Sequence, residues 1–150
     1  MRLGVLKEPL HENRVSIVPA SVKKLTKLGF NVVVEHGAGQ KSHYMDEEYV
    51  EFGAILSEST DVFSCDIIVS ICMPDISKCK SGQIVICIAD PFRNPDRVNL
   101  ANEMGISLIS MDMIPRRLSR AQSMDVLSSQ ANLAGYKAVI EASSIFKKAL

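Results

Sequence analysis

The stretch Asp-Ile-Ile-Val-Ser-Ile-Cys at residues 66–72 is an apolar run that ends two residues before Pro74. A run of this length, bounded by a proline, indicates a buried strand. The β-branched segment Asn-Val-Val-Val-Glu at residues 31–35, followed by Gly37 and Gly39, predicts another. Strands that are apolar throughout, rather than at every second residue, are typical of a parallel sheet covered on both faces.

Helical patterns alternate with these strands. Val22, Leu25 and Leu28 share one face of a helix predicted over residues 20–28, and Gly29 ends it. Further strands are predicted at 2–7, 83–89 and 106–110, and further helices at 46–52 and 94–104. This alternation predicts an α/β fold, with a parallel flavodoxin-like sheet and helices on both faces.

Composition restricts the possible functions. The 150 residues suffice for one domain with a hydrophobic core, and 47% of them are hydrophobic. Seventeen basic and seventeen acidic residues cancel, so the concentrated basic face that nucleic acid requires is missing. No window approaches the ~20 apolar residues of a membrane span, and no signal peptide is recognisable. We therefore expect a cytoplasmic protein that does not bind nucleic acid.

The cysteines and histidines give no sign of a metal or nucleophile site. The cysteines lack Cys-x-x-Cys spacing, so we interpret them as reduced structural residues and expect no metal. The histidines lie in polar segments and are expected at the surface. These residues are Cys65, Cys72, Cys79, Cys87, His11, His36 and His43.

The glycine-rich segment Gly-Ala-Gly-Gln-Lys-Ser at residues 37–42 follows a strand, as a phosphate-binding turn would. Ser42 replaces the third glycine of that fingerprint, and no helical pattern begins directly after it. We interpret the segment as an ordinary turn.

From Gln122 to the end, small residues recur and proline is missing, which predicts a long helix with one closely packed face. The pattern reaches Leu150 without a cap or breaker, so we expect the natural chain to continue. Before this helix, residues 114–125 gather three arginines with Gln122 and Asp125. Such groups can bind an anion, an amide or a ribose hydroxyl. They can equally form a helix entrance, with Ser123 or Gln122 near the cap and the arginines solvated.

The sequence Arg-Leu-Ser-Arg-Ala-Gln-Ser-Met-Asp-Val-Leu-Ser-Ser-Gln-Ala-Asn-Leu-Ala-Gly-Tyr-Lys-Ala at residues 117–138 resembles the Arg-Gln-Asp loop and following helix of the NAD(H) component of proton-translocating NAD(P) transhydrogenases. The opening segments at 4–8 and 12–15, together with Pro19, resemble a pattern that transhydrogenases share with alanine dehydrogenases. Gly37-Ala38-Gly39 also belongs to that pattern. The resemblance covers essentially the whole chain.

Two positions distinguish the two enzymes, and a third is shared. Where alanine dehydrogenases have a lysine and a histidine that handle pyruvate, this sequence has Cys72 and Asp90. Hydride transfer between two nicotinamides needs positioning and little acid–base chemistry, so both replacements favour a transhydrogenase. Arg14, which binds the substrate carboxylate in the dehydrogenases, is retained and is interpreted as structural.

The resemblance implies a site and a function. Arg117, Asp125 and Ser128 would hold the dihydronicotinamide end of NADH, and Gln122 would reach toward the partner nucleotide as the catalytic residue. Hydride would pass to NADP⁺ on a separate NADP(H)-binding component, coupled to proton translocation through a membrane component.

The resemblance also implies an assembly. Residues 1–150 would be the first domain of a two-domain parent, with the long C-terminal helix linking it to a Rossmann NAD-binding domain beyond residue 150. The parent would be a homodimer, peripheral on the cytoplasmic side of the inner membrane. The fragment alone would be inactive. The alternatives are an alanine dehydrogenase-like oxidoreductase and a non-catalytic stand-alone module of the same fold.

Overall fold

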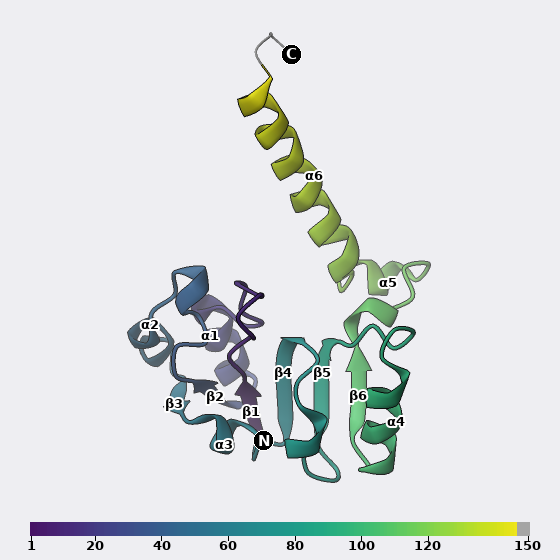
Figure 1. The fold of residues 1–150 in the computed structure, drawn as a ribbon. Coiled ribbons are helices and arrows are strands. Elements are labelled where there is room, and N and C mark those ends of the chain that lie inside the picture. Colours follow the sequence, from purple (N-terminus) through teal and green to yellow (C-terminus); the bar gives the residue numbers. More distant parts are fainter. Residues whose placement is uncertain (147–150) are drawn as a thin grey trace. The chain divides into compact units, whose positions relative to one another are not determined.

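The computed structural model describes residues 1–146 and divides into two units, Met1–Ser110 and the part that begins at Met111. The first unit contains one six-stranded sheet in which every strand is parallel to its neighbours (Figure 1). Its strands are β1 (Arg2–Val5), β2 (Asn31–Glu35), β3 (Ile55–Ser57), β4 (Ile67–Cys72), β5 (Ile84–Ile88) and β6 (Ser107–Ser110). The predicted α/β class and parallel sheet are confirmed.

The strand order is β3-β2-β1-β4-β5-β6. Without the edge strand β3, the remaining order is that of a flavodoxin-like sheet, as predicted. The strand β3, which was not predicted from the sequence, has only three residues and packs beside β2. With β3 included, the order equals that of dinucleotide-binding sheets. The connection after β1, residues 6–18, nevertheless contains no glycine, so it lacks the turn that receives a pyrophosphate in such folds.

Helices cover both faces of this sheet and bury two separate cores. Val22 of α1 and Tyr49 of α2 pack with β1 and β2 on one face, whereas Val62 of α3 and Ala101 of α4 pack with β4 and β5 on the other. Parallel strands buried on both faces account for the uninterrupted apolar runs in the sequence. The helices of this unit are α1 (Pro19–Lys27), α2 (Asp46–Glu51), α3 (Ser59–Val62) and α4 (Pro95–Glu103), with 3₁₀ turns η1 (Gln40–Ser42) and η2 (Ile76–Lys78).

The second unit contains η3 (Met111–Met113), α5 (Ser119–Gln122) and α6 (Val126–Ile145). The long helix was predicted from Gln122, but it begins at Val126, because the short helix α5 and its cap occupy the preceding residues. The predicted portion over residues 147–150 lies outside the described residues. No helix within residues 1–146 has the length and apolarity needed to cross a membrane.

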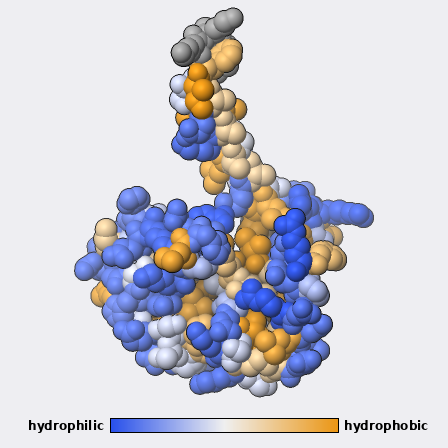
Figure 2. All heavy atoms as spheres, viewed as in Figure 1, coloured by the Kyte–Doolittle hydropathy of each residue, from blue (hydrophilic) through white to orange (hydrophobic). Residues whose placement is uncertain are grey.

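Helix α6 is rich in apolar residues, and none of its side chains is buried within the described chain. Figure 2 shows these apolar residues along the helix. The expectation that one face of α6 packs closely on another surface therefore stays a prediction. Its most exposed large apolar residues are Leu133, Tyr136, Val139 and Ile145.

The glycine turn after β2 is confirmed as a packing feature. A Cβ at Gly39 would lie 2.7 Å from the ring of the buried Tyr49, so only glycine fits there. The following residues form the short turn η1 rather than a helix that could hold phosphate.

Gly4 in β1 provides a test of the close approach between α3 and the sheet. A Cβ there would lie 2.8 Å from the Val62 carbonyl oxygen and 3.2 Å from the Cys65 Cβ. We expect Gly4→Ala to lower the free energy of unfolding by about 1–3 kcal/mol, measured by urea denaturation. Gly135→Ala is the control, because a Cβ there meets open space in a helix and should be neutral or stabilising. Equal stability of Gly4→Ala and the wild type would contradict this packing.

Candidate functional site

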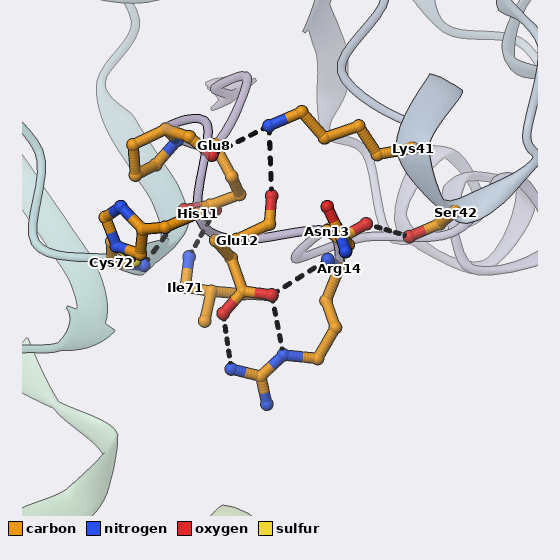
Figure 3. A network of polar contacts seen from close by, with 10 residues as sticks. Glu8, His11, Glu12, Asn13, Arg14, Lys41, Ser42, Ile71 and Cys72 are labelled. Carbon is orange, nitrogen blue, oxygen red and sulfur yellow. Dashed lines mark hydrogen bonds and ion pairs between the residues drawn. The ribbon is translucent and has the colours of Figure 1, made fainter.

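The carboxyl ends of β1 and β4 meet at the point where successive strands turn to opposite sides of the sheet. Ligands of open parallel sheets bind at such switch points. Here the Glu8 side chain, only 6% exposed, bridges the two strands. Its carboxylate accepts hydrogen bonds from the backbone N–H of Ile71 at 2.5 Å and of Cys72 at 3.0 Å (Figure 3). These two N–H groups lie where the pairing of β4 with β5 changes register. The Glu8 carboxylate therefore accepts hydrogen bonds from backbone N–H groups at an irregular point of the sheet.

Burial raises the pKa of Glu8, and the two backbone hydrogen bonds partly offset that effect. The neighbouring Cys72 thiol also has a raised pKa, first through burial and then through the charges of Glu8 and Glu12. A thiol held in its protonated form is a poor nucleophile. The 3.9 Å approach of His11 Nε2 to the Cys72 sulfur therefore does not form an activated Cys–His pair.

Arg14 is held by a carboxylate of its own loop. Its Nε donates to Glu12 Oε1 at 2.9 Å, and its terminal nitrogen lies 2.6 Å from Glu12 Oε2. This fork-to-fork contact lowers the pKa of Glu12 to about 2, with the Arg14 side-chain hydrogen bond as the main cause. The interpretation of Arg14 as a structural residue agrees with this geometry.

Two residues of η1 fix the same loop through three hydrogen bonds. Lys41 Nζ donates to the carbonyl oxygens of Pro9 at 2.8 Å and Glu12 at 3.3 Å, and Ser42 Oγ donates to the Asn13 carbonyl at 2.7 Å (Figure 3). Lys41 and Ser42 thus anchor the chain between β1 and α1 rather than a phosphate. This role and that of Glu8 were not predicted from the sequence, because both depend on contacts between distant segments.

Asp90 lies two residues after the next strand, β5, in a left-handed conformation with φ of 44°. The Asn94 side chain donates to the carbonyl oxygens of Ala89 and Asp90, at 3.0 and 3.1 Å, and thereby shapes the turn. Asp90 therefore has a local role in a turn.

The predicted nicotinamide-binding residues all lie in the second unit. Asp125 caps α6, and its Oδ1 accepts the Ser128 backbone N–H at 3.0 Å. The Ser128 hydrogen bonds are the main cause of the lowered pKa of Asp125, and Arg116 contributes. Asp125 is therefore an ionised acceptor at neutral pH. The segment does form a helix entrance, in which Asp125 is the N-cap of α6 and Ser123 is the C-cap of α5.

Arg117 and Gln122 are exposed, and neither has a side-chain partner among residues 1–146. Gln122 is the last residue of α5. The structure thus joins Asp125 to Ser128 through the cap, and the Asp125 backbone N–H donates to the Gln122 carbonyl oxygen at 3.3 Å. Within residues 1–146, no side-chain hydrogen bond joins Arg117 or Gln122 to either residue. An ionised acceptor beside available guanidinium and amide donors suits a carboxamide or a ribose hydroxyl.

The structure also gives the burial of the cysteines and histidines. Cys65, Cys79 and Cys87 are buried, and all three histidines are exposed, as predicted. No group of three or more potential metal ligands occurs in the described part of the chain.

Comparisons with known proteins agree on one relationship. A family model described as alanine dehydrogenase/PNT, N-terminal domain, matches residues 4–134. The alpha subunit of an NAD(P) transhydrogenase from Haemophilus influenzae is 39% identical over 97% of this chain and 29% of its own length. A crystal structure of a transhydrogenase from Sinorhizobium meliloti superimposes with a TM-score of 0.94 and 44% identity, over 100% of this chain and 46% of that one.

An alanine dehydrogenase from Methanococcus maripaludis is 31% identical over 90% of this chain and 37% of its own length. The chain therefore spans less than half the length of each of these relatives. Identity is higher to the transhydrogenase subunit, and it extends over more of this chain.

The Arg14–Glu12 pair predicts a measurable acid dependence. The folded-state pKa of Glu12 is about 2, below its ordinary value of 4.5, so the pair stabilises the fold above about pH 4.5. This contribution is lost as the pH falls from 4.5 toward 2. We expect Glu12→Gln to reduce the free energy of unfolding by roughly 1 kcal/mol at pH 7, with the difference from wild type shrinking at pH 2–3.

Urea denaturation at several pH values measures this difference. Glu47→Gln, at an exposed residue in the first turn of α2, is the matched control. A difference between Glu12→Gln and the wild type that stays constant from pH 7 to pH 2 would show that the pair does not carry the effect.

Proposed function

The chain belongs to the alanine dehydrogenase/PNT N-terminal domain family, and we propose that it is the first domain of the NAD(H)-binding alpha subunit of an NAD(P) transhydrogenase. The observation that carries this proposal is the match to the transhydrogenase subunit along nearly the whole chain, including the segment with Arg117, Gln122 and Asp125. In the complete protein, hydride passes from NADH to NADP⁺ on a partner component, coupled to proton translocation by a membrane component.

The chemistry at the switch point supports this proposal over a dehydrogenase. A dehydrogenase acting on a keto acid needs a cation for the substrate carboxylate and a group that exchanges a proton. Here Arg14 is engaged by Glu12, Cys72 is a protonated thiol and Asp90 shapes a turn. Transfer between two nicotinamides has no such requirement, because NADH itself supplies the hydride and the protein supplies position.

The loop around α5 fits this positioning role. Asp125, fixed as the cap of α6, would accept hydrogen bonds from the nicotinamide end of NADH, and Ser128 lies one turn further along the helix. Arg117 would donate to an oxygen of the carboxamide. Gln122, exposed at the end of α5, would face the second nucleotide and hold the two reacting rings in register.

The assembly belongs to the same proposal. The relatives extend well beyond the region matched by this chain, so we place the adenosine and pyrophosphate on a Rossmann domain that follows α6. Association with NADP(H)-binding and membrane components, a homodimeric parent and a position at the cytoplasmic face of the inner membrane complete the proposal.

Binding of NADH to the 150-residue chain tests this division of the site. The connection after β1 contains no glycine, and the pyrophosphate contacts that anchor a dinucleotide would lie on another domain. We expect weak or undetectable binding by calorimetric titration, with a dissociation constant above about 1 mM. Low-micromolar affinity would show that the nucleotide site lies within this domain.

Gln122→Asn tests the proposed function in the full-length protein assembled with its NADP(H)-binding partner. The change shortens the side chain by one methylene and keeps the amide, so it reports reach and orientation. A displacement of about 1 Å can reduce a proximity-dependent rate about a hundredfold. We expect such a fall in single-turnover hydride transfer, measured by stopped flow, with little change in NADH affinity.

Gln40→Asn, in the exposed turn η1, is the matched control and should leave transfer unchanged. A Gln122→Asn variant with wild-type transfer and a slightly lowered melting temperature would identify Gln122 as a helix-end residue only. No detectable transfer between NADH and NADP⁺ in the wild-type assembly would refute the proposed function itself.

A further inference from the structure

The Cys72 thiol and the His11 imidazole meet at the carboxyl edge of the sheet, and the proposed function gives a role to neither of them. The His11 Nε2 atom lies 3.9 Å from the Cys72 sulfur (Figure 3). Cys72 ends β4, whereas His11 lies in the connection between β1 and α1, so the contact joins segments 61 residues apart. The fold thus brings together a sulfur and an imidazole nitrogen, which are both ligands for soft metal ions.

Cys72 differs from the other three cysteines in its access to solvent. The others are buried, and each is no more than 5% exposed. Cys72 is partly exposed and lines a cavity of about 360 Å³. Neither of the other two histidines contacts a cysteine within residues 1–146. A dissolved ion can therefore reach this thiol and its neighbouring imidazole.

The separation of the two atoms suits a metal ion bound between them. Bonds of about 2.3 Å to sulfur and about 2.0 Å to an imidazole nitrogen span roughly 3.5 Å at a tetrahedral angle and roughly 4.3 Å when they are collinear. The observed 3.9 Å lies between these limits. His11 is exposed, so its ring can make the small movement that either geometry requires.

The number of available ligands determines which ion fits. A structural zinc ion takes four protein ligands in a tetrahedron. No group of three or more metal-binding side chains occurs within residues 1–146, so the pair offers one sulfur and one nitrogen. Two soft ligands suit a monovalent ion with a filled d shell, and Cu(I) is the ion of this kind that thiolate sulfur selects.

The charges around the sulfur also favour a monovalent cation. Burial raises the pKa of the Cys72 thiol, and the charges of Glu8 and Glu12 raise it further. Arg14 acts in the opposite direction and is the smaller influence. The two carboxylates therefore stabilise a positive charge at the position of the thiol proton. A monovalent ion that replaces this proton leaves the net charge of the site unchanged.

We propose that Cys72 and His11 bind one Cu(I) ion in a two-coordinate site. The ion forms one bond to the Cys72 sulfur and one to His11 Nε2, the thiol proton leaves to solvent, and nothing is oxidised or reduced. The bound ion would connect the end of β4 to the loop after β1, beside the link that Glu8 makes. The site contains none of the four proposed nicotinamide-binding residues, so it does not rest on the proposed function.

Competition between the untagged 150-residue chain and a chromophoric Cu(I) chelator, without oxygen at pH 7, tests this site. We expect one Cu(I) ion per chain, and no such binding by Cys72→Ser. Groups that merely orient metal ligands are worth about 10–100-fold in affinity, so His11→Asn should weaken binding at least about tenfold. His43→Asn is the matched control and should bind Cu(I) as the wild type does, because His43 is exposed and asparagine tolerates its left-handed conformation.

The ¹⁵N amide spectrum of each variant reports whether the fold is intact. In the wild type, Cu(I) should shift the amide signals of His11 and Cys72 and of their chain neighbours most. Wild-type affinity in His11→Asn would show that the thiol alone holds the ion, and binding by folded Cys72→Ser would place the ion elsewhere. Either result would overturn the proposal.

Zn²⁺ provides a test of the ion class. It should bind at least about a hundredfold more weakly than Cu(I), because two ligands leave its tetrahedron half filled. Equal affinity for Zn²⁺ would show that the site has more than two ligands and would also overturn the proposal. None of these measurements involves NADH or NADP⁺, so they are independent of hydride transfer in the full-length assembly.

Discussion

Two hydrogen bonds from the end of β4 to the carboxylate of Glu8, which follows β1, hold the carboxyl edge of the sheet together. β1 and β4 are adjacent, yet the chain between them builds two strands and three helices before it returns. Where the β4–β5 ladder changes register, Glu8 supplies the acceptor for two backbone N–H groups. Leaving such donors unpaired costs about 1–3 kcal/mol each, so this one side chain sets the geometry of the switch point.

The charged side chains at this edge are held in fixed contacts with other groups of the chain. Glu12 is bound to Arg14, Glu8 to backbone N–H groups and Asp90 to its own turn, while Cys72 remains a thiol. The same fold could support acid–base chemistry if groups titrating near neutral pH stood at these positions. In the proposed function, fixed charges at these positions would let the chain keep the sheet and its opening segment while its reaction differs from that of a dehydrogenase.

The sequence predicted those parts of the fold that are encoded in long local patterns. The strands at 31–35 and 67–72 emerged from apolar runs, and α1 from its periodic face and final glycine. β3 and α3 were missed because three or four residues carry too little periodicity. The start of α6 was misplaced because Gln122, Ser123 and Asp125 are all plausible near a cap, and only the hydrogen bond to Ser128 decides among them. The roles of Glu8 and Lys41 could not be predicted, since their partners lie 63 and 32 residues away.

The proposed nicotinamide site depends on the hydrogen bond that caps the start of α6. Asp125 is ionised because Ser128 donates to it at the first turn of α6, and that bond also fixes the direction of its carboxylate. The residue that would bind the cofactor is thus oriented by the backbone before any cofactor arrives, which reduces the entropy lost on binding. The Gln122 side chain has no comparable restraint within residues 1–146, so in the proposed function its orientation would come from the second nucleotide or from the protein that carries it. This difference matches the proposed division of labour, in which Asp125 anchors one reactant and Gln122 responds to the arrival of the other.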